Sequence, residues 1–505
     1  MSRRLQIIVA LFAWLHLSSA GAAFGQTVDT SAWLEDFAQL KREMSDHYAN
    51  LEWAIEQRGL DLKQLSEGTE TRLRQARSDP EAQKAIESFL GEFGDGHLEI
   101  VWARGGGDAP ARDADPRPAK QPPLCERLGY RSHDVSPRLV FSRLNSFREV
   151  KTEDSRYFPA GLLSLPGGRS VGVIRIHLFS EYMFPGLCER AASEAGLDGA
   201  SPCDEECEDR VERAAANLLT AAFARQITTL KRSRISALVV DVTGNGGGTN
   251  WVEPAARTLT AAPLRSPRQA FIRHEHWTRQ LRARLAAVEA DASQATPAHR
   301  GLLLRAAETL RQALRETQQP CARESIWEDR KPGCSLVAAA PPLYPQSVLP
   351  YAKPGSLPDA PSSRYIFYPS RYAYVEGVYT GRLLVLVDRG TASSAEYFTA
   401  MLRDNRAATV IGEPTVGAGC GYTNGGIPTV LKNSRARVKI PDCVRVRADG
   451  SNEVAGITPD SLIPWRRNDS PFQRVKRVFD VLARTPGAQA ARRGVAGRRG
   501  GAAHR

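Results

Sequence analysis

Residues 382–396, RLLVLVDRGTASSAE, hold the pattern that decides the fold of this 505-residue chain. The apolar run from Leu383 to Val387 is uninterrupted, which is typical of a strand buried on both faces. The small residues from Gly390 to Ala395 favour a tight turn, and helical spacing continues from there through Met401. A buried strand that leads directly into a helix indicates an α/β protein.

A second buried strand, Ile235 to Asp241 (ISALVVD), ends in the glycine-rich turn Gly244 to Gly248 (GNGGG). Glycines let several backbone N–H groups point at one anion, which can be a phosphate or a developing oxyanion. Neither a GxxxxGK[ST] motif nor a GxGxxG motif that opens a helix is present, so phosphate binding is not favoured. The turn by itself is also compatible with a purely structural role.

Patterns on either side extend the α/β region and add helices. Strands are expected at Ser170–Phe179 and Thr409–Ile411, with a long helix over 204–230 between them. Residues 30–93 have apolar side chains at three- and four-residue steps, which predicts a small helical domain. Residues 266–319 have helical spacing and no strand pattern, so we expect a helical hairpin inserted in the core.

The chain begins with a basic start, an apolar stretch and then small residues, in the order of a secretory signal peptide, which is favoured over a buried first helix. A periplasmic or secreted protein is therefore expected. The expected organisation is a signal peptide (1–23), an N-terminal helical domain that ends in the His97 turn (24–101), a linker and unclassified segment (102–165), the first half of the core (166–265), a helical insertion (266–340), the second half of the core (341–482) and a disordered basic tail (483–505).

The net charge of +12 lies mostly at the two ends of the chain. Six arginines fall between Arg484 and Arg505, and two more are Arg3 and Arg4. The chain between them carries only a small positive surplus, so we expect no nucleic-acid groove. The tail is either a solvated end or a weak attachment to an anionic lipid or envelope polymer. No internal apolar run is long enough for a stable membrane span, and the oligomeric state is not indicated.

Eight cysteines, an even number, favour disulfides in an exported protein. The local pairs Cys321–Cys334 and Cys420–Cys443 are the expected ones, because each closes a short loop. Cys203 and Cys207 have no further ligands at a suitable spacing, so a disulfide is favoured over half of a metal site.

Ser393 lies between the buried strand and the following helix, where free N–H groups stabilise negative charge. A serine at this place is often only the N-cap of the helix. A nucleophilic serine also needs a general base and usually an orienting carboxylate. His97 is the candidate base because it follows a helix end in Asp95-Gly96-His97, and His177 on an expected strand is the alternative.

Four segments, in order along the chain, resemble the tail-specific, or C-terminal processing, serine peptidases. They are GDGHLEI (94–100), ALVVDVTGNGGG (237–248), LLVLVDRGTASSAEYFTAMLRDNRAATVIGEPTVGAG (383–419) and NEVAGITPD (452–460). The third is the most specific, because the family's nucleophilic serine precedes a glutamate by three residues, as Ser393 precedes Glu396. The resemblance implies a crotonase/ClpP-like spiral core of strands and helices.

Ala418 stands where many family members carry a lysine that pairs with the serine, and a methyl group cannot accept a proton. The tricorn-like branch of the family uses a histidine, the serine and a late glutamate instead. His97 and Ser393 match the first two, and Glu453 matches the third because it precedes the glycine of the G-x-x-P-D motif by three residues. The resemblance therefore implies a Ser393 acyl-enzyme, with His97 as general base and Glu453 as orienting carboxylate. Glu453 is expected either to fix the His97 ring or to complete a polar relay to it.

The oxyanion is expected to bind backbone N–H groups of Gly246 or Gly247 together with that of Ser394. This chemistry requires no metal or organic cofactor, and the resemblance implies polypeptide substrates. The usual family member carries a PDZ module, but residues 102–165 lack its glycine-rich carboxylate loop and paired strands.

A protein of another class is also compatible with this fold, because the fold serves non-catalytic proteins that bind hydrophobic ligands or peptides. Ser393 would then be only a helix cap, and GNGGG only a turn. The presence of Ser393 together with His97 and Glu453 favours the peptidase, since a binding protein needs none of them. A third possibility is an interaction scaffold built on the hairpin of residues 266–319.

Overall fold

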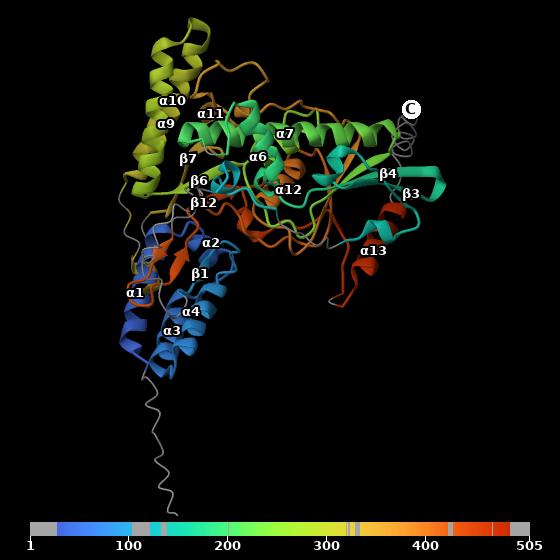
Figure 1. The fold of residues 1–505 in the computed structure, drawn as a ribbon. Coiled ribbons are helices and arrows are strands. Elements are labelled where there is room, and N and C mark those ends of the chain that lie inside the picture. The colour runs from blue at the N-terminus through green and yellow to red at the C-terminus, as the bar shows by residue number, and fades with distance from the viewer. Residues whose placement is uncertain are drawn as a thin grey trace, which may run out of the picture.

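The computed structural model describes residues 28–103, 122–132, 139–199, 201–319, 321, 324–328, 334–422, 428–466 and 468–484 (Figure 1). The expected signal peptide, most of the Gly/Pro-rich half of the expected linker and the basic tail from residue 485 lie outside these ranges.

The centre of the molecule is a seven-stranded mixed sheet. Its order is β13 (Ser461–Leu462), β9 (Thr409–Gly412), β8 (Arg382–Val387), β5 (Ala237–Asp241), β4 (Arg169–Arg175), β3 (Ala160–Leu165) and β2 (Phe147–Glu149). The strands from β13 to β4 are parallel, and β3 and β2 continue the sheet antiparallel at one edge. The four expected strands are thus present, and the unclassified segment supplies β2 and β3.

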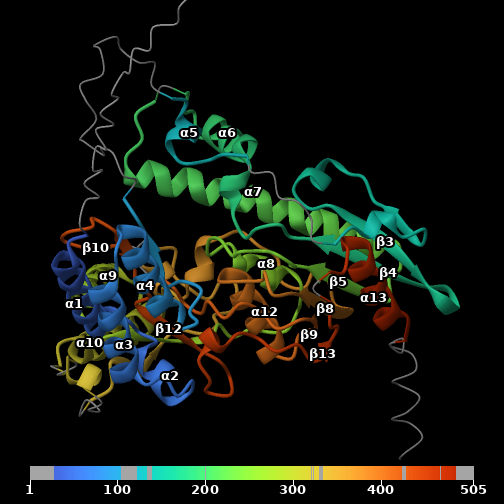
Figure 2. The same ribbon diagram turned by 90° about the horizontal axis from the view of Figure 1, so that it is seen from below.

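Both faces of β5 are buried, as its continuous apolar sequence predicts. Leu238 and Val240 pack in one hydrophobic cluster, and Ala237 and Val239 pack in another on the opposite face. The covering helices are α7 (Glu205–Arg232), α8 (Val252–Thr258) and α12 (Ser394–Asp404) on one face and α13 (Pro471–Arg484) on the other (Figures 1 and 2). Two shorter helices, α5 (Leu124–Arg127) and α6 (Pro185–Glu194), lie outside α7 (Figure 2). The fold is a mixed α/β fold.

The N-terminal helices form a second hydrophobic cluster. They are α1 (Thr30–His47), α2 (Leu51–Glu56), α3 (Leu62–Gln75) and α4 (Asp79–Gly91), followed by β1 (Glu99–Val101). β1 pairs with β11 (Arg437–Lys439), which pairs with β10 (Thr429–Val430), so this helical part is joined to the last quarter of the chain (Figure 2). The N-cap residue of α4 is Ser78, and the Asp79 carboxylate accepts a hydrogen bond from the Trp33 indole at 2.9 Å.

The helical hairpin consists of α9 (Glu275–Gln294) and α10 (Pro297–Thr317), which project from the core (Figure 1). The expectation of no strand in residues 266–319 is wrong, because Arg268–Ile272 forms β6. β6 lies between β12 (Cys443–Val446) and β7 (Val337–Leu343) in a three-stranded sheet. Its partners lie far away in sequence, so no local pattern shows this pairing. The short helix α11 (Ser363–Ile366) follows.

All eight cysteines are paired, as Cys125–Cys188, Cys203–Cys207, Cys321–Cys334 and Cys420–Cys443. The two expected local pairs and the disulfide at Cys203–Cys207 are confirmed. Four disulfides are typical of proteins of an oxidising compartment outside the cytoplasm.

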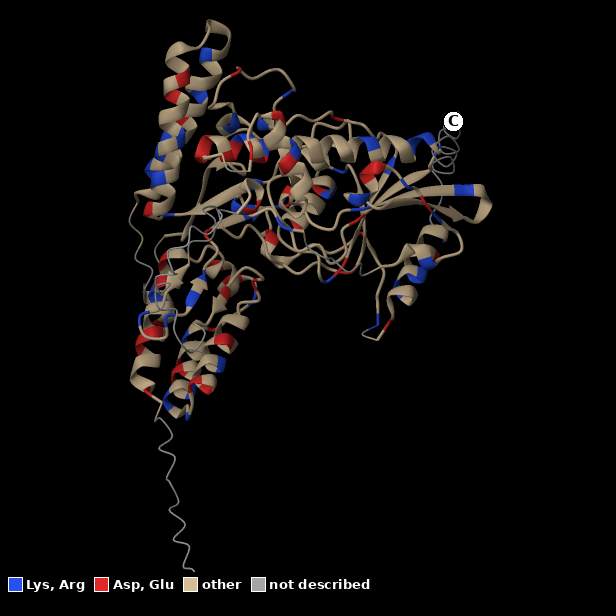
Figure 3. Cartoon of the chain, in the orientation of Figure 1, with Lys and Arg blue, Asp and Glu red and all other residues tan. Residues whose placement is uncertain are grey.

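Acidic and basic residues are interspersed along the described helices and strands (Figure 3). Among the described helices, none has the length and apolar composition needed to cross a bilayer.

Candidate active site

The site lies where two neighbouring parallel strands end. β5 and β8 are paired in register from Ala237–Arg382 to Asp241–Leu386, so the turns that follow them meet at the same sheet edge. The contact between the turns requires glycine at position 247. A Cβ atom there would lie 2.6 Å from the Ser393 Cβ, closer than side chains normally approach.

Ser393 is the N-cap residue of α12 and has the unusual backbone angles φ 54° and ψ −120°. A residue with a side chain pays about 1–3 kcal/mol for such a conformation, which is found most often at functional sites. The turn is held by the Glu396 carboxylate, which accepts a hydrogen bond from the Ser393 N–H at 3.0 Å. Glu396 also accepts from Thr415 and from the N–H groups of Gly417 and Ala418. One buried carboxylate thus joins the serine turn to the loop of residues 415–421.

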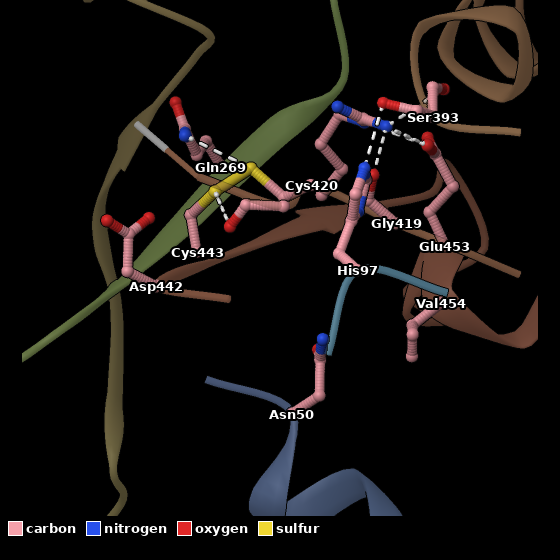
Figure 4. The surroundings of a disulfide bond; sticks show 12 residues. Asn50, His97, Gln269, Ser393, Gly419, Cys420, Asp442, Cys443, Glu453 and Val454 are labelled. Atoms are coloured by element: carbon pink, nitrogen blue, oxygen red, sulfur yellow. Dashed lines mark hydrogen bonds and ion pairs between the residues drawn. A yellow bond between two sulfur atoms is a disulfide. The ribbon is translucent and has the colours of Figure 1, made fainter. Parts of the chain in front are cut away.

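The His97 ring reaches this turn from the segment between α4 and β1 (Figure 4). Its Nε2 lies 3.0 Å from the Ser393 Oγ, and its Nδ1 lies 2.5 Å from the Ala418 carbonyl oxygen. A carbonyl only accepts hydrogen bonds, so Nδ1 carries the hydrogen. Nε2 of the neutral ring is then the acceptor for the Ser393 hydroxyl, which is the arrangement that a general base needs.

The pKa of His97 is lowered to about 4, mainly because burial disfavours the charged ring. The Ala418 carbonyl acts in the opposite direction, and the positive charge of Arg445 lowers the pKa further. The ring is therefore neutral at neutral pH and can accept a proton.

Asp95 fixes the turn that carries His97. One carboxylate oxygen accepts from the His97 N–H at 2.9 Å, and the other accepts from Asn50 at 2.7 Å and Tyr48 at 3.2 Å. Burial raises the pKa of Asp95 to about 6. Tyr48 and Asn50, in the short connection between α1 and α2, were not predicted to hold this carboxylate, because only the fold brings them to the turn.

Glu453 is buried at the same site but does not orient the His97 ring directly. Among the described residues its Oε1 accepts from the Arg445 Nε at 2.8 Å, while its Oε2 has no hydrogen-bond partner (Figure 4). Of the two roles expected for Glu453, direct fixing of the ring does not match the structure, because the Ala418 carbonyl holds Nδ1 and Glu453 is paired with Arg445. The polar relay stays a prediction. The sequence carried one signal for Arg445, a charged residue within the apolar strand CVRV.

The candidate oxyanion groups differ in availability. The Gly247 N–H already donates to the Asn245 side chain at 2.9 Å. The N–H groups of Gly246 and Ser394 have no acceptor among the described residues, and Ser394 stands in the first turn of α12, where N–H groups lack helical partners. Gly246 and Ser394 are therefore the pair that can bind an oxyanion.

The alternative base, His177, does not contact Ser393. The His177 ring accepts from Arg175 at 3.4 Å and has no hydrogen bond to Ser393. The Ala418 side chain is a buried methyl group, as expected, and only its backbone takes part. In the described ranges no group of three or more His, Cys, Asp or Glu residues could hold a metal ion.

A family model described as peptidase family S41 matches residues 170–463, which is more than half of the chain. Ser393 and Glu453 lie inside this range, and His97 lies before it. One curated relative, the carboxyl-terminal-processing peptidase 2, chloroplastic, of Arabidopsis thaliana, is 34% identical over 84 residues. That stretch spans 16% of this chain and 15% of the relative.

Among solved structures, the fold is similar to that of mature CPAF. The complex of mature CPAF with lactacystin has a TM-score of 0.56 at 16% identity and covers 90% of this chain and 98% of that one. A second structure of mature CPAF has a TM-score of 0.53 at 16% identity, with coverage of 90% and 96%. At this level of identity the likeness extends to the fold alone.

Proposed function

Since the chain belongs to peptidase family S41, a family of serine-type peptidases, we propose that it is an exported serine endopeptidase of the carboxyl-terminal processing type. Its nucleophile is Ser393, its general base is His97, and its substrates are polypeptides. The observation that carries the proposal is the 3.0 Å contact between the His97 Nε2 and the Ser393 Oγ. We also propose that the core is a crotonase/ClpP-like spiral.

The reaction begins when His97 Nε2 takes the Ser393 hydroxyl proton while Oγ attacks the carbonyl carbon of the scissile peptide bond. The N–H groups of Gly246 and Ser394 stabilise the negative oxygen, and one such donor is worth roughly 3 kcal/mol. The protonated ring then gives its proton to the leaving amine, which releases the C-terminal product. Water attacks the remaining ester, again with His97 as base, and restores Ser393.

Glu453 takes part in this proposal through Arg445. The carboxylate holds the guanidinium, and the guanidinium in turn donates to the backbone carbonyls of Ser393 and Gly419. Its role is to position the site.

The proposed export rests on the order of features in residues 1–23 and on the four disulfides. N-terminal sequencing of the protein recovered from the periplasm or the medium should give a start near Phe24 or Gln26. A start at Met1 or Ser2 would contradict the proposed signal peptide.

Covalent labelling with a fluorophosphonate tests the proposed nucleophile. We expect the wild-type protein to be labelled at Ser393, and Ser393→Ala to abolish labelling because it removes the hydroxyl that contacts His97 Nε2. His97→Gln should lower the labelling rate by a factor on the order of 10³ or more. Ser293→Ala, an exposed serine on α9, is the matched control and should label normally. A folded wild-type protein that is not labelled would favour the alternative, a non-catalytic protein that binds a hydrophobic ligand or a peptide.

A further inference from the structure

Arg445 is a buried residue of β12 whose side chain meets acceptors from three separate segments. Its guanidinium donates to Glu453 Oε1 at 2.8 Å, to the Ser393 carbonyl at 3.2 Å and to the Gly419 carbonyl at 2.5 Å (Figure 4). A planar fork with five N–H groups can reach several acceptors at once, which an ammonium on a flexible stem does less well.

The hydrogen bond from Arg445 to the Gly419 carbonyl affects His97 indirectly, through the neighbouring Ala418 carbonyl. Ala418, the preceding residue, supplies the carbonyl that holds His97 Nδ1. When Arg445 fixes the Gly419 carbonyl, it also restricts the peptide plane next to the Ala418 carbonyl. The orientation of the His97 ring, and therefore the alignment of its Nε2 with the Ser393 hydroxyl, depends on the loop of residues 415–421.

The bond to Ser393 acts on the nucleophile. The strained Ser393 backbone is held at its N–H by Glu396 and at its carbonyl by Arg445. Without the second anchor, the turn can relax toward ordinary helical angles, which would move Oγ away from the base.

Glu453 compensates the buried charge of Arg445, since a buried cation without a partner is costly. We propose that Arg445 is the positioning residue of this site, joining Glu453 to the nucleophile turn and to the loop that holds the base. This inference rests on the proposed function.

Because Arg445 is charged, its replacement by a neutral residue should change the pKa of His97. Loss of a purely structural contact would not have this effect. The charged groups acting on the His97 ring are Arg445, Glu99 and Lys439. Replacing only Arg445 by a neutral residue should raise the pKa of His97, because a nearby positive charge disfavours the protonated ring. Replacement by lysine should leave that pKa near its original value.

The experiment measures the fluorophosphonate labelling rate from acidic to neutral pH for the wild type, Arg445→Gln and Arg445→Lys. The matched control is Arg447→Gln. Arg447 lies next to the same strand, is equally buried, and pairs with Asp404 at 2.6 Å instead of with the site. Thermal unfolding of each variant reports on folding, and histidine NMR follows the His97 ring in the same proteins.

We expect Arg445→Gln to lower the labelling rate roughly 100-fold. The acid limb of the pH profile, where the rate falls as His97 becomes protonated, should move to higher pH. Arg445→Lys should lose rate but keep the limb of the wild type. Arg447→Gln should unfold at a lower temperature but keep the labelling rate and the acid limb of the wild type.

A folded Arg445→Gln protein with the rate and limb of the wild type would overturn the inference. If the wild type itself is not labelled, the proposed function fails, and the NMR titration then decides about Arg445 alone. An upward shift of the His97 titration in Arg445→Gln supports the inference, and an unchanged titration overturns it.

Discussion

Ala418 serves the site entirely through its backbone. Its carbonyl holds the Nδ1 of His97, and its N–H donates to Glu396. This position, where many family members carry a lysine, therefore supplies two backbone hydrogen bonds here. The base that we propose, His97, comes from another part of the chain.

The low pKa of His97 predicts activity in acid. Because burial above all lowers this pKa to about 4, the ring stays unprotonated from neutral pH down to mildly acidic pH. We expect the rate of Ser393 labelling to be constant over that range and to fall to half near pH 4, as protonation removes the base. The check is a labelling-rate profile under conditions where circular dichroism shows the native fold. A midpoint near 6.5, the ordinary value for histidine, would contradict a buried base.

Gly247 is the residue whose size allows the two turns to meet. Its φ of 109° is unfavourable for other residues, and a Cβ would lie 2.9 Å from the Ser394 nitrogen. We expect Gly247→Ala to lower the labelling rate by a factor of roughly 100 by displacing the oxyanion donors. Gly246→Ala is the matched variant, since open space surrounds that position. Equal losses in both variants would argue against this steric reason.

At the scale of elements, β12 supports the site by two links to the loop of residues 415–421. Arg445 is one link, and the Cys420–Cys443 disulfide is the other (Figure 4). The described residues 415–422 belong to no helix or strand, so the position of this part of the chain depends on such links.

This arrangement predicts that the disulfides are not equivalent. Cys420→Ser with Cys443→Ser should lower the labelling rate about tenfold or more, because the Ala418 carbonyl is then less well placed. The same double change at Cys203 and Cys207 should leave the rate unaltered, since that bond closes only a short turn before α7. Labelling rates and free thiol counts of both variants check this. Equal rates would show that β12 needs no disulfide to hold the loop.

At the scale of the whole molecule, the site joins the N-terminal helices to the end of the core. The Asn50 side chain, at the start of α2, donates to Asp95 through Nδ2, and its Oδ1 accepts from the Asn452 side chain at 2.8 Å. The base and the Glu453 turn are therefore connected through one amide, although 402 residues separate Asn50 from Asn452.

Asn50→Ala removes this connection. The buried Asp95 loses a donor, so we expect the protein to be destabilised by about 1–3 kcal/mol and the labelling rate to fall about tenfold. Asn433→Ala, which removes an amide that links the 433 turn to α1 away from the site, is the control and should affect stability only. Urea unfolding and labelling rates separate the two effects. An Asn50→Ala protein with normal labelling would show that the N-terminal helices do not position the base.

The amino-acid sequence was enough to predict the buried strands β5 and β8, the serine at a strand–helix turn, the hairpin helices and two local disulfides. These follow from the spacing of neighbouring residues, which a chain carries without being folded. The pairing of β6 with β12, the contact of the His97 ring with the Ala418 carbonyl and the contacts of Arg445 with the Ser393 and Gly419 carbonyls exist only in the folded chain. Each depends on groups far apart in the chain, such as His97 and Ala418 at a separation of 321 residues, and no local pattern records which distant donor reaches which acceptor.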